Sequence, residues 1–184
     1  EHLQIKGRYI LTSVKSGIMI IDQHKAHVRI LFDRYMQHIQ EKKGASQQLL
    51  FPEKIQLPPS QQAEFQSVEK DFDALGFDIS DIGGGTYAVN AIPSGIEGLD
   101  IPMLIDKMLE TATQKGGDIS IDVHETISLT LAESAAIPYG QVLSSQEMEN
   151  LINDLFSLPV PNYTPDGKLI ILLISDDELQ KRFK

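Results

Sequence analysis

The stretch Gly17-Ile-Met-Ile-Ile-Asp-Gln-His-Lys-Ala-His-Val-Arg-Ile-Leu-Phe-Asp33 decides the fold of this chain. Its first part, Ile18 to Ile21, is a run of four apolar residues, which predicts a β-strand buried on both faces. Apolar residues then recur at helical spacing, which predicts a helix directly after the strand. These residues are Val28, Leu31, Phe32, Tyr35 and Ile39.

The polar residues between the strand and the helix allow two interpretations. Asp22 is placed to accept a free backbone N–H of the first helical turn, and His24 lies in the same turn. A carboxylate and an imidazole at one junction can belong to a common site. In the simpler interpretation, Asp22 is only a helix cap and His24 only a surface residue. Spacing alone leaves both interpretations open, and caps are far commoner than active sites.

The composition is that of an ordinary globular protein. The 184 residues are 41% apolar and 23% charged, which is enough for a sizeable core. The formal net charge of −10 argues against a stand-alone nucleic-acid binder, because phosphate affinity comes mainly from clustered Lys and Arg. The absence of cysteine excludes disulfides and thiolate metal sites. No run reaches the ~18 apolar residues of a membrane span. Because the first residue is Glu1, we expect a fragment of a longer protein.

The order of expected elements predicts a discontinuous domain of the α/β (α+β) class. Two strands, over 4–14 and 18–21, precede the helix, which we expect to end near Gly44. A middle part reads α β β α between Pro58-Pro59 and Gly116-Gly117, and the last part reads α α β α. We therefore expect one lobe from residues 1–56 and 126–184 and an inserted lobe from 57–125. The apolar runs 18–21 and 169–174 are expected side by side in one sheet, the second as a central strand.

Several short segments, taken in order, resemble the C-terminal domain of the DNA mismatch repair protein MutL over essentially the whole chain. These segments are Gly7-Arg-Tyr-Ile-Leu11, Ile20-Ile-Asp-Gln-His24, Leu49-Leu-Phe-Pro52, Leu131-Ala-Glu-Ser-Ala-Ala-Ile-Pro-Tyr-Gly140 and Val142-Leu-Ser144. The resemblance implies a dimerisation lobe built from both ends of the chain and an inserted external regulatory lobe. It implies a homodimer scaffold in a bacterial, cytoplasmic and nucleoid-associated protein. It further implies contact with the mismatch recognition protein MutS and with DNA through the full-length protein, whose missing N-terminal region would bind ATP.

Many members of this family are latent metal-dependent endonucleases, and the resemblance places their motif on residues 22–33. Asp22, Gln23 and His24 match the motif, and Asp33 stands at its second glutamate. Val28 replaces the first glutamate, a metal-bridging ligand in the family, and an isopropyl group cannot bind a metal. The resemblance therefore implies a degenerate motif and a domain without activity or cofactor of its own.

An alternative is an active nuclease with an altered ligand set. The cysteine and histidine positions of two other family segments fall on Glu133, Thr164 and Asp166. Asp22, His24, Glu133 and Asp166 could then hold Mg²⁺ or Mn²⁺, because oxygen donors suit these ions. Loss of the bridging glutamate argues against the alternative, since two-metal phosphodiester cleavage relies on bridging carboxylates.

A further functional segment is Gln47-Gln-Leu-Leu-Phe-Pro52. It resembles the short peptide with which MutL proteins contact the replication sliding clamp. Leu49, Leu50 and Phe51 would enter an apolar pocket, Gln47 would bind at its rim, and Pro52 would limit the entropy of the free peptide. The alternative is a linker whose leucines pack on their own domain. If the family resemblance misleads, we expect a general α/β protein-interaction domain.

Overall fold

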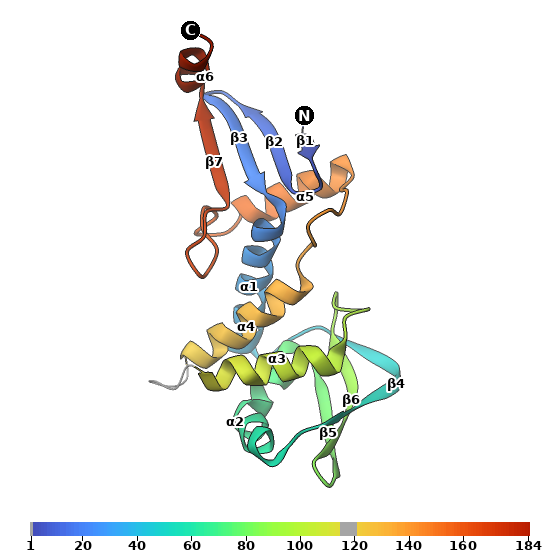
Figure 1. Cartoon of the computed structure of the whole chain (residues 1–184). Helices are drawn as coiled ribbons and strands as arrows, with labels where there is room; N and C mark the ends of the chain where they lie inside the picture. Colours follow the sequence, from blue (N-terminus) through green and yellow to red (C-terminus); the bar gives the residue numbers. More distant parts are fainter. Residues whose placement is uncertain (1, 115–120) are drawn as a thin grey trace. The chain divides into compact units, whose positions relative to one another are not determined.

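The computed structural model of this chain describes residues 2–114 and 121–184. The chain divides into two compact units. The terminal unit consists of Glu1–Leu31 and Ala136–Lys184, and the central unit consists of Phe32–Ala135. Each unit combines helices with an antiparallel sheet, as Figure 1 shows, so the expected α+β class is confirmed. No helix among the described residues is both long and apolar enough to cross a membrane.

The terminal unit contains a four-stranded antiparallel sheet in the order β1-β2-β3-β7. Its strands are β1 (His2–Ile5), β2 (Tyr9–Val14), β3 (Gly17–Asp22) and β7 (Ile171–Ser175). Ile18 pairs with Ile174 and Ile21 with Ile171, which confirms that the two apolar runs lie side by side (Figure 1).

The position of β7 differs from the expectation. β7 is an edge strand, so the expected central position is wrong. A continuous apolar run usually indicates burial on both faces. Here Leu172 and Leu173 are 48% and 49% exposed, so the apolar run of β7 does not reflect burial of both faces within the chain.

One face of this sheet forms the core of the terminal unit. Ile10 and Ile21 are completely buried against helix α5 (Ser145–Phe156). The α5 residues in this core share one face of the helix; they are Met148, Leu151, Ile152 and Leu155. The spacing of Ser144 and Glu147 predicts a capping box, and the helix begins with one, in which each side chain accepts the other residue's backbone N–H. A second capping box, at Ser175, begins the short helix α6 (Asp176–Arg182).

The single strand expected over residues 4–14 is instead a hairpin of β1 and β2. Lys6 and Gly7 turn the chain with φ angles of 54° and 56°, and the Arg8 N–H donates to the Ile5 carbonyl at 3.0 Å. Glycine at a left-handed position is typical of a turn. The apolar alternation on both sides of Lys6-Gly7 concealed this signal.

The central unit packs a three-stranded antiparallel sheet, in the order β4-β6-β5, with helices. Its strands are β4 (Ser46–Gln56), β5 (Asp78–Gly83) and β6 (Thr86–Pro93). The helices are α2 (Pro59–Leu75), α3 (Ile101–Gln114) and α4 (Ile121–Ala135). Alternate residues of β6 point into the core, where Tyr87 meets Phe65 of α2 at 5.1 Å between ring centroids. Helix α1 (Gln23–Glu41) begins in the terminal unit and contributes its residues from Phe32 onward to the central unit.

Most helix boundaries follow the sequence signals, and the start of α2 does not. The Asp100 carboxylate accepts the Met103 N–H at 2.9 Å, as expected for the start of α3. Gly76, a residue type that commonly ends helices, closes α2 in a left-handed conformation. Ser60 precedes the apolar stripe of this helix and predicts a cap there, but this prediction is wrong. Helix α2 begins at Pro59, whose missing N–H needs no partner, after Pro58 as the N-cap residue.

The bounds of the two units differ from those expected for the lobes, 1–56, 57–125 and 126–184. Strand β4 pairs with β6, so residues 46–56 belong to the central unit. Helix α4 belongs there as well, because it packs on α3. Gly116 and Gly117, used to place the expected boundary, lie outside the described residues.

Candidate functional site

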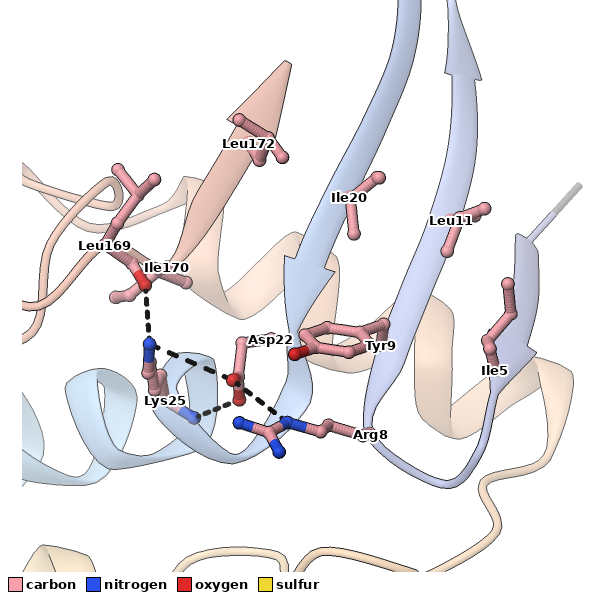
Figure 2. Close-up of a pocket in the computed structure, with 10 residues that line it drawn as sticks. All are labelled: Ile5, Arg8, Tyr9, Leu11, Ile20, Asp22, Lys25, Leu169, Ile170 and Leu172. Atoms are coloured by element: carbon pink, nitrogen blue, oxygen red, sulfur yellow. Dashed lines mark hydrogen bonds and ion pairs between the residues drawn. The ribbon is translucent and has the colours of Figure 1, made fainter. Parts of the chain in front are cut away.

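The junction between β3 and α1 places a buried carboxylate among hydrogen-bond donors and cations. Asp22 is 5% exposed, and its Oδ1 accepts the Lys25 backbone N–H at 3.2 Å, so Asp22 caps α1. Both oxygens also lie 3.2–3.3 Å from the Tyr139 hydroxyl, which donates. Arg8 Nε and Lys25 Nζ lie 3.8 and 4.0 Å from Oδ2 (Figure 2). The negative charge of Asp22 is therefore balanced within the chain.

An exposed aromatic side chain covers this carboxylate. The Arg8 guanidinium lies 4.4 Å from the centroid of the Tyr139 ring, and the His24 ring lies 4.8 Å from it. Burial, together with the Asp22 carboxylate, raises the pKa of the Tyr139 hydroxyl above its ordinary value. Tyr139 therefore keeps its proton at neutral pH and acts as a donor to Asp22.

Gln23 is completely buried, and all its polar side-chain atoms have partners. Its Nε2 donates to the carbonyls of Gly7 at 2.8 Å and Gln141 at 3.1 Å. Its Oε1 accepts from Gln4 Nε2 at 2.6 Å. This amide joins the turn between β1 and β2 to the segment before α5.

Two histidines bind the same residue of that segment. His24 Nδ1 lies 2.9 Å from the Ile137 carbonyl oxygen, so this nitrogen carries the proton. His27 Nδ1 accepts the Ile137 N–H at 2.9 Å. His24 is therefore more than a surface residue of the first turn. Val28, at the position of the bridging glutamate, is 4% exposed and part of the core, and Asp33 lies half-buried in the central unit.

The other expected metal donors have partners of their own or lie elsewhere. Asp166 pairs with Lys168 Nζ at 2.6 Å and accepts from the Thr164 hydroxyl. Burial alone would raise the pKa of Asp166, but these bonds outweigh burial and hold the pKa below its ordinary value. Glu133 is exposed on α4 of the central unit. Over 2–114 and 121–184, no three His, Asp or Glu side chains are grouped so that they could hold a metal ion.

Beside the junction, the second face of the terminal sheet is apolar and exposed. The strand register aligns Leu3 with Leu11, Leu11 with Ile20, and Ile20 with Leu172. These four residues form one row across all four strands, and we call the surface around them the open sheet face. Leu3 is 62% exposed and Leu172 48% exposed. A groove of about 440 Å³ runs along this face, with Leu11, Ile20 and Leu172 on its apolar part and Arg8, Asp22 and Lys25 at one end (Figure 2).

In the central unit, β4 carries a bulge within Gln47–Pro52, the segment expected to contact the sliding clamp. The pairing of β4 with β6 shifts register between Gln48 and Glu53. The residues between them leave the ladder, and Leu50 and Phe51 are 94% and 85% exposed. Pro52 also lies within this bulge, where a residue without an N–H is tolerated. Gln47 remains paired with Ile92 of β6. We call residues 49–52 the β4 bulge.

The fold and these surfaces define a two-unit α+β domain whose terminal sheet has one apolar, exposed face. The chain belongs to the family described as MutL C terminal dimerisation domain, whose sequence model matches residues 2–156. It is 55% identical over its full length to the DNA mismatch repair protein MutL of Bacteroides fragilis and 50% identical to that of Phocaeicola vulgatus. The MutL protein of Porphyromonas gingivalis is 33% identical over 97% of this chain. The chain spans only 29–30% of the length of these relatives.

Sequence reasoning missed the residues that complete the junction. Arg8, Lys25 and Tyr139 surround Asp22, and Gln4 and Gln141 surround Gln23. Arg8 and Tyr139 lie within the segments that carried the family resemblance, beside Gly7 and Gly140. Each of the two segments places a glycine next to a large polar side chain. This shared pattern is the signal that could have predicted contact between the segments.

Proposed function

We propose that this chain is the self-association domain of a MutL-type DNA mismatch repair protein, and that two copies dimerise through the open sheet face. The observation that carries the proposal is the apolar row of Leu3, Leu11, Ile20 and Leu172 across all four strands. The family description names dimerisation, and the relatives are mismatch repair proteins. The proposal concerns the role of this domain within a longer MutL-type protein.

The physical argument rests on the cost of leaving such a row in water. Burial of apolar surface contributes about 25 cal/mol per Å². A two-fold interface uses the same patch on both copies, so each leucine or isoleucine contributes twice. An edge strand with exposed leucines, such as β7, invites association unless a partner covers it. Dimerisation removes this surface from water.

Sedimentation velocity over a dilution series tests the dimer. The wild-type chain is expected to sediment as a dimer at micromolar concentration. Leu172→Asp is expected to sediment as a monomer with an unchanged circular dichroism spectrum, because Leu172 is half-exposed within one chain. A wild-type monomer at every concentration would remove the proposal.

We further propose that this domain is a scaffold without strand-nicking activity of its own. Val28 supplies no metal ligand, and Asp22 already has Tyr139, Arg8 and Lys25 around it. The donor set does not fit a divalent ion, since two cations and a hydroxyl donor already surround the carboxylate that would bind it. The runner-up is an active Mn²⁺- or Mg²⁺-dependent endonuclease using Asp22, His24, Glu133 and Asp166.

Incubation of the full-length protein with supercoiled plasmid and Mn²⁺ separates these two functions. The scaffold proposal expects no more nicked plasmid than in a reaction without protein. Nicking that depends on Mn²⁺ and disappears in Asp22→Asn would establish the endonuclease instead.

The β4 bulge is proposed as a docking peptide for the replication sliding clamp. Leu50 and Phe51 are almost fully exposed, which supports a binding role over a linker packed on its own domain. An apolar pocket on the clamp would bury both side chains, and the proline limits the entropy lost on binding. Gln47→Ala combined with Leu50→Ala is expected to abolish capture of the chain by immobilised clamp. Unchanged capture would exclude the bulge as the docking site.

The remaining partners belong to the proposal for the whole protein. An N-terminal ATPase region would bind ATP and DNA, and MutS would recruit the dimer to a mismatch. The curated relatives come from bacteria, which supports a bacterial cytoplasmic, nucleoid-associated setting.

A further inference from the structure

Asp22, Gln23 and His24 at the β3–α1 junction all bind one connecting segment of the chain. This segment, residues 137–143, leads from α4 to α5 and is called the return segment below. We propose that Asp22, Gln23 and His24 form a staple that fixes the return segment, and that this staple is their role in place of metal binding. The inference deepens the scaffold part of the proposed function and does not depend on dimerisation.

Each of the three residues holds a different position of the return segment. His24 donates to the Ile137 carbonyl at 2.9 Å, and Asp22 accepts from the Tyr139 hydroxyl at 3.2 Å. Gln23 donates to the Gln141 carbonyl at 3.1 Å. The contacts fall on alternate residues, 137, 139 and 141. Three consecutive residues of one junction therefore attach to three positions of a segment that turns at Tyr139–Gly140.

The turn between β1 and β2 lies against the same segment. The Gly140 N–H donates to the Gly7 carbonyl at 2.9 Å, and Gly7 has a φ of 56°. A Cβ atom at Gly7 would lie 2.6 Å from the Gly140 carbonyl carbon, so no larger residue fits. Gln4 accepts the Leu143 N–H at 3.1 Å and donates to the Gln141 carbonyl at 2.9 Å. The return segment is thus held from two sides.

The staple determines where α5 begins. Leu143, at the end of the return segment, is 6% exposed and belongs to the same core as Ile10 and Ile21. Ser144 follows it directly as the cap of α5, the helix that packs under the sheet. Fixing residues 137–143 therefore fixes the support of the sheet whose other face is the open sheet face.

The charges around Asp22 complete the argument. Both carboxylate oxygens lie within hydrogen-bond distance of the Tyr139 hydroxyl, and Oδ1 also accepts the Lys25 N–H. Arg8 and Lys25 supply positive charge at 3.8 and 4.0 Å. A divalent ion would have to displace the hydroxyl and approach two cations, which costs electrostatic energy at a carboxylate that is 5% exposed.

Hydrogen exchange on the 184-residue chain, followed by mass spectrometry, tests the staple directly. Gln23→Leu removes a buried amide and leaves the Gly7 and Gln141 carbonyls without this donor. We expect exchange in residues 137–143 to rise about tenfold or more and the melting temperature to fall by about 4–8 °C. The matched control is Gln146→Leu, an exposed glutamine on α5 that bonds Asn150, and it should leave both quantities unchanged.

A milder variant keeps the test informative if Gln23→Leu fails to fold. Tyr139→Phe removes one hydroxyl from a half-exposed ring, and we expect exchange in the same segment to rise about threefold. Wild-type exchange rates in either folded variant would overturn the staple. So would protection of residues 137–143 by millimolar Mn²⁺ that Asp22→Asn abolishes. A monomeric chain with a protected return segment would instead contradict dimerisation alone.

Discussion

The two sheets of this protein are built alike on their core faces and differ on their outer faces. Each is antiparallel and packs one face on helices. The outer face of the central sheet is polar: Asn90 donates to Ser80 at 2.9 Å and to Asp78 at 3.3 Å, and Thr86 donates to Gln56 at 2.7 Å. The outer face of the terminal sheet carries the row from Leu3 to Leu172.

This difference separates a sheet face that water solvates from an apolar face that we propose a second copy covers. Polar side chains on the central sheet bond one another across strands and are solvated by water. Apolar side chains on the terminal sheet gain free energy only when another surface removes them from water. The β4 bulge is an apolar exception on the central sheet, as is Ile82 of β5, and the bulge stands outside the strand ladder. The two candidate contact surfaces therefore differ in local structure: one is an apolar sheet face, and the other is a bulge outside the strand ladder.

The largest effect is expected from a charge on the open sheet face. Ile20→Asp places one carboxylate from each copy in the proposed interface, and burying unpaired charges costs several kcal/mol. We expect the dimer to weaken on the order of a thousandfold in sedimentation equilibrium, about 4 kcal/mol. The matched control is Ala88→Asp, on the outer face of the central strand β6, where Lys54 and Ser80 are the paired neighbours. If Ala88→Asp weakened the dimer as much as Ile20→Asp, the two outer sheet faces would not differ in their contribution to dimerisation.

The next effect compares two residues of the same strand. Ile55 of β4 is 5% exposed and Leu50 is 94% exposed. Ile55→Ala should reduce the free energy of unfolding by about 3 kcal/mol and the melting temperature by about 6–12 °C. Leu50→Ala should leave the melting temperature within about 1 °C, because the side chain makes little contact within the chain. A large loss of stability in Leu50→Ala would show that the bulge packs on its own domain.

Alkaline pH should weaken the central unit through its buried tyrosines. Burial raises the pKa of Tyr35 to about 12, with Glu97 adding to the rise and Arg34 opposing it. Burial also raises the pKa of Tyr87, on the core face of the central sheet. The pKa of Tyr35 is higher in the folded protein than in the unfolded chain. The contribution of Tyr35 to the free energy of unfolding is therefore complete below pH 10 and is lost as the pH rises through about 12. The loss from Tyr35 is about 2–3 kcal/mol.

Urea unfolding at a series of pH values measures this loss, and Tyr35→Phe provides the control. The variant should keep its stability between pH 10 and 12 better than the wild type does. Identical pH profiles for the two proteins would rule out Tyr35 as the cause.

The smallest effect concerns the polar outer face of the central sheet. Asn90→Ala removes the bonds to Ser80 and Asp78, which are exposed to water. Exposed hydrogen bonds exchange for bonds to water at little net cost, so we expect a loss of about 0.5 kcal/mol. Chemical unfolding in urea measures it. A loss several times larger would mean that this face is not simply solvated.

The sequence located most elements because their signals are local. The apolar stripe from Val28 to Ile39 marked α1, and the serine–glutamate pair at Ser144 and Glu147 marked the start of α5. The pairing of runs 18–21 and 169–174 also followed, because two apolar strands of one lobe have few other places to lie. The turn at Lys6-Gly7 was missed, since the apolar alternation of residues 3–11 continues through it.

The candidate sites were less predictable. Asp22 as a helix cap followed from one residue and its position in the chain. The neighbours of Asp22 did not, because Tyr139 is 117 residues away, and the Gln23 bond to Gln141 spans 118 residues. The exposure of Leu50 and Phe51 depends on a register shift between two strands, which a linear pattern does not record.

The sequence by itself therefore determined the family, the α+β class and the strand–helix junction at Asp22. These depend on periodicity, capping and short segments, whose physics acts within a few residues. Only the tertiary structure decided that β7 is an edge strand, that one sheet face remains apolar and uncovered, and that Asp22, Gln23 and His24 bind the return segment. Each of these depends on contacts between residues far apart in the chain, and their geometry is set by packing of the whole unit.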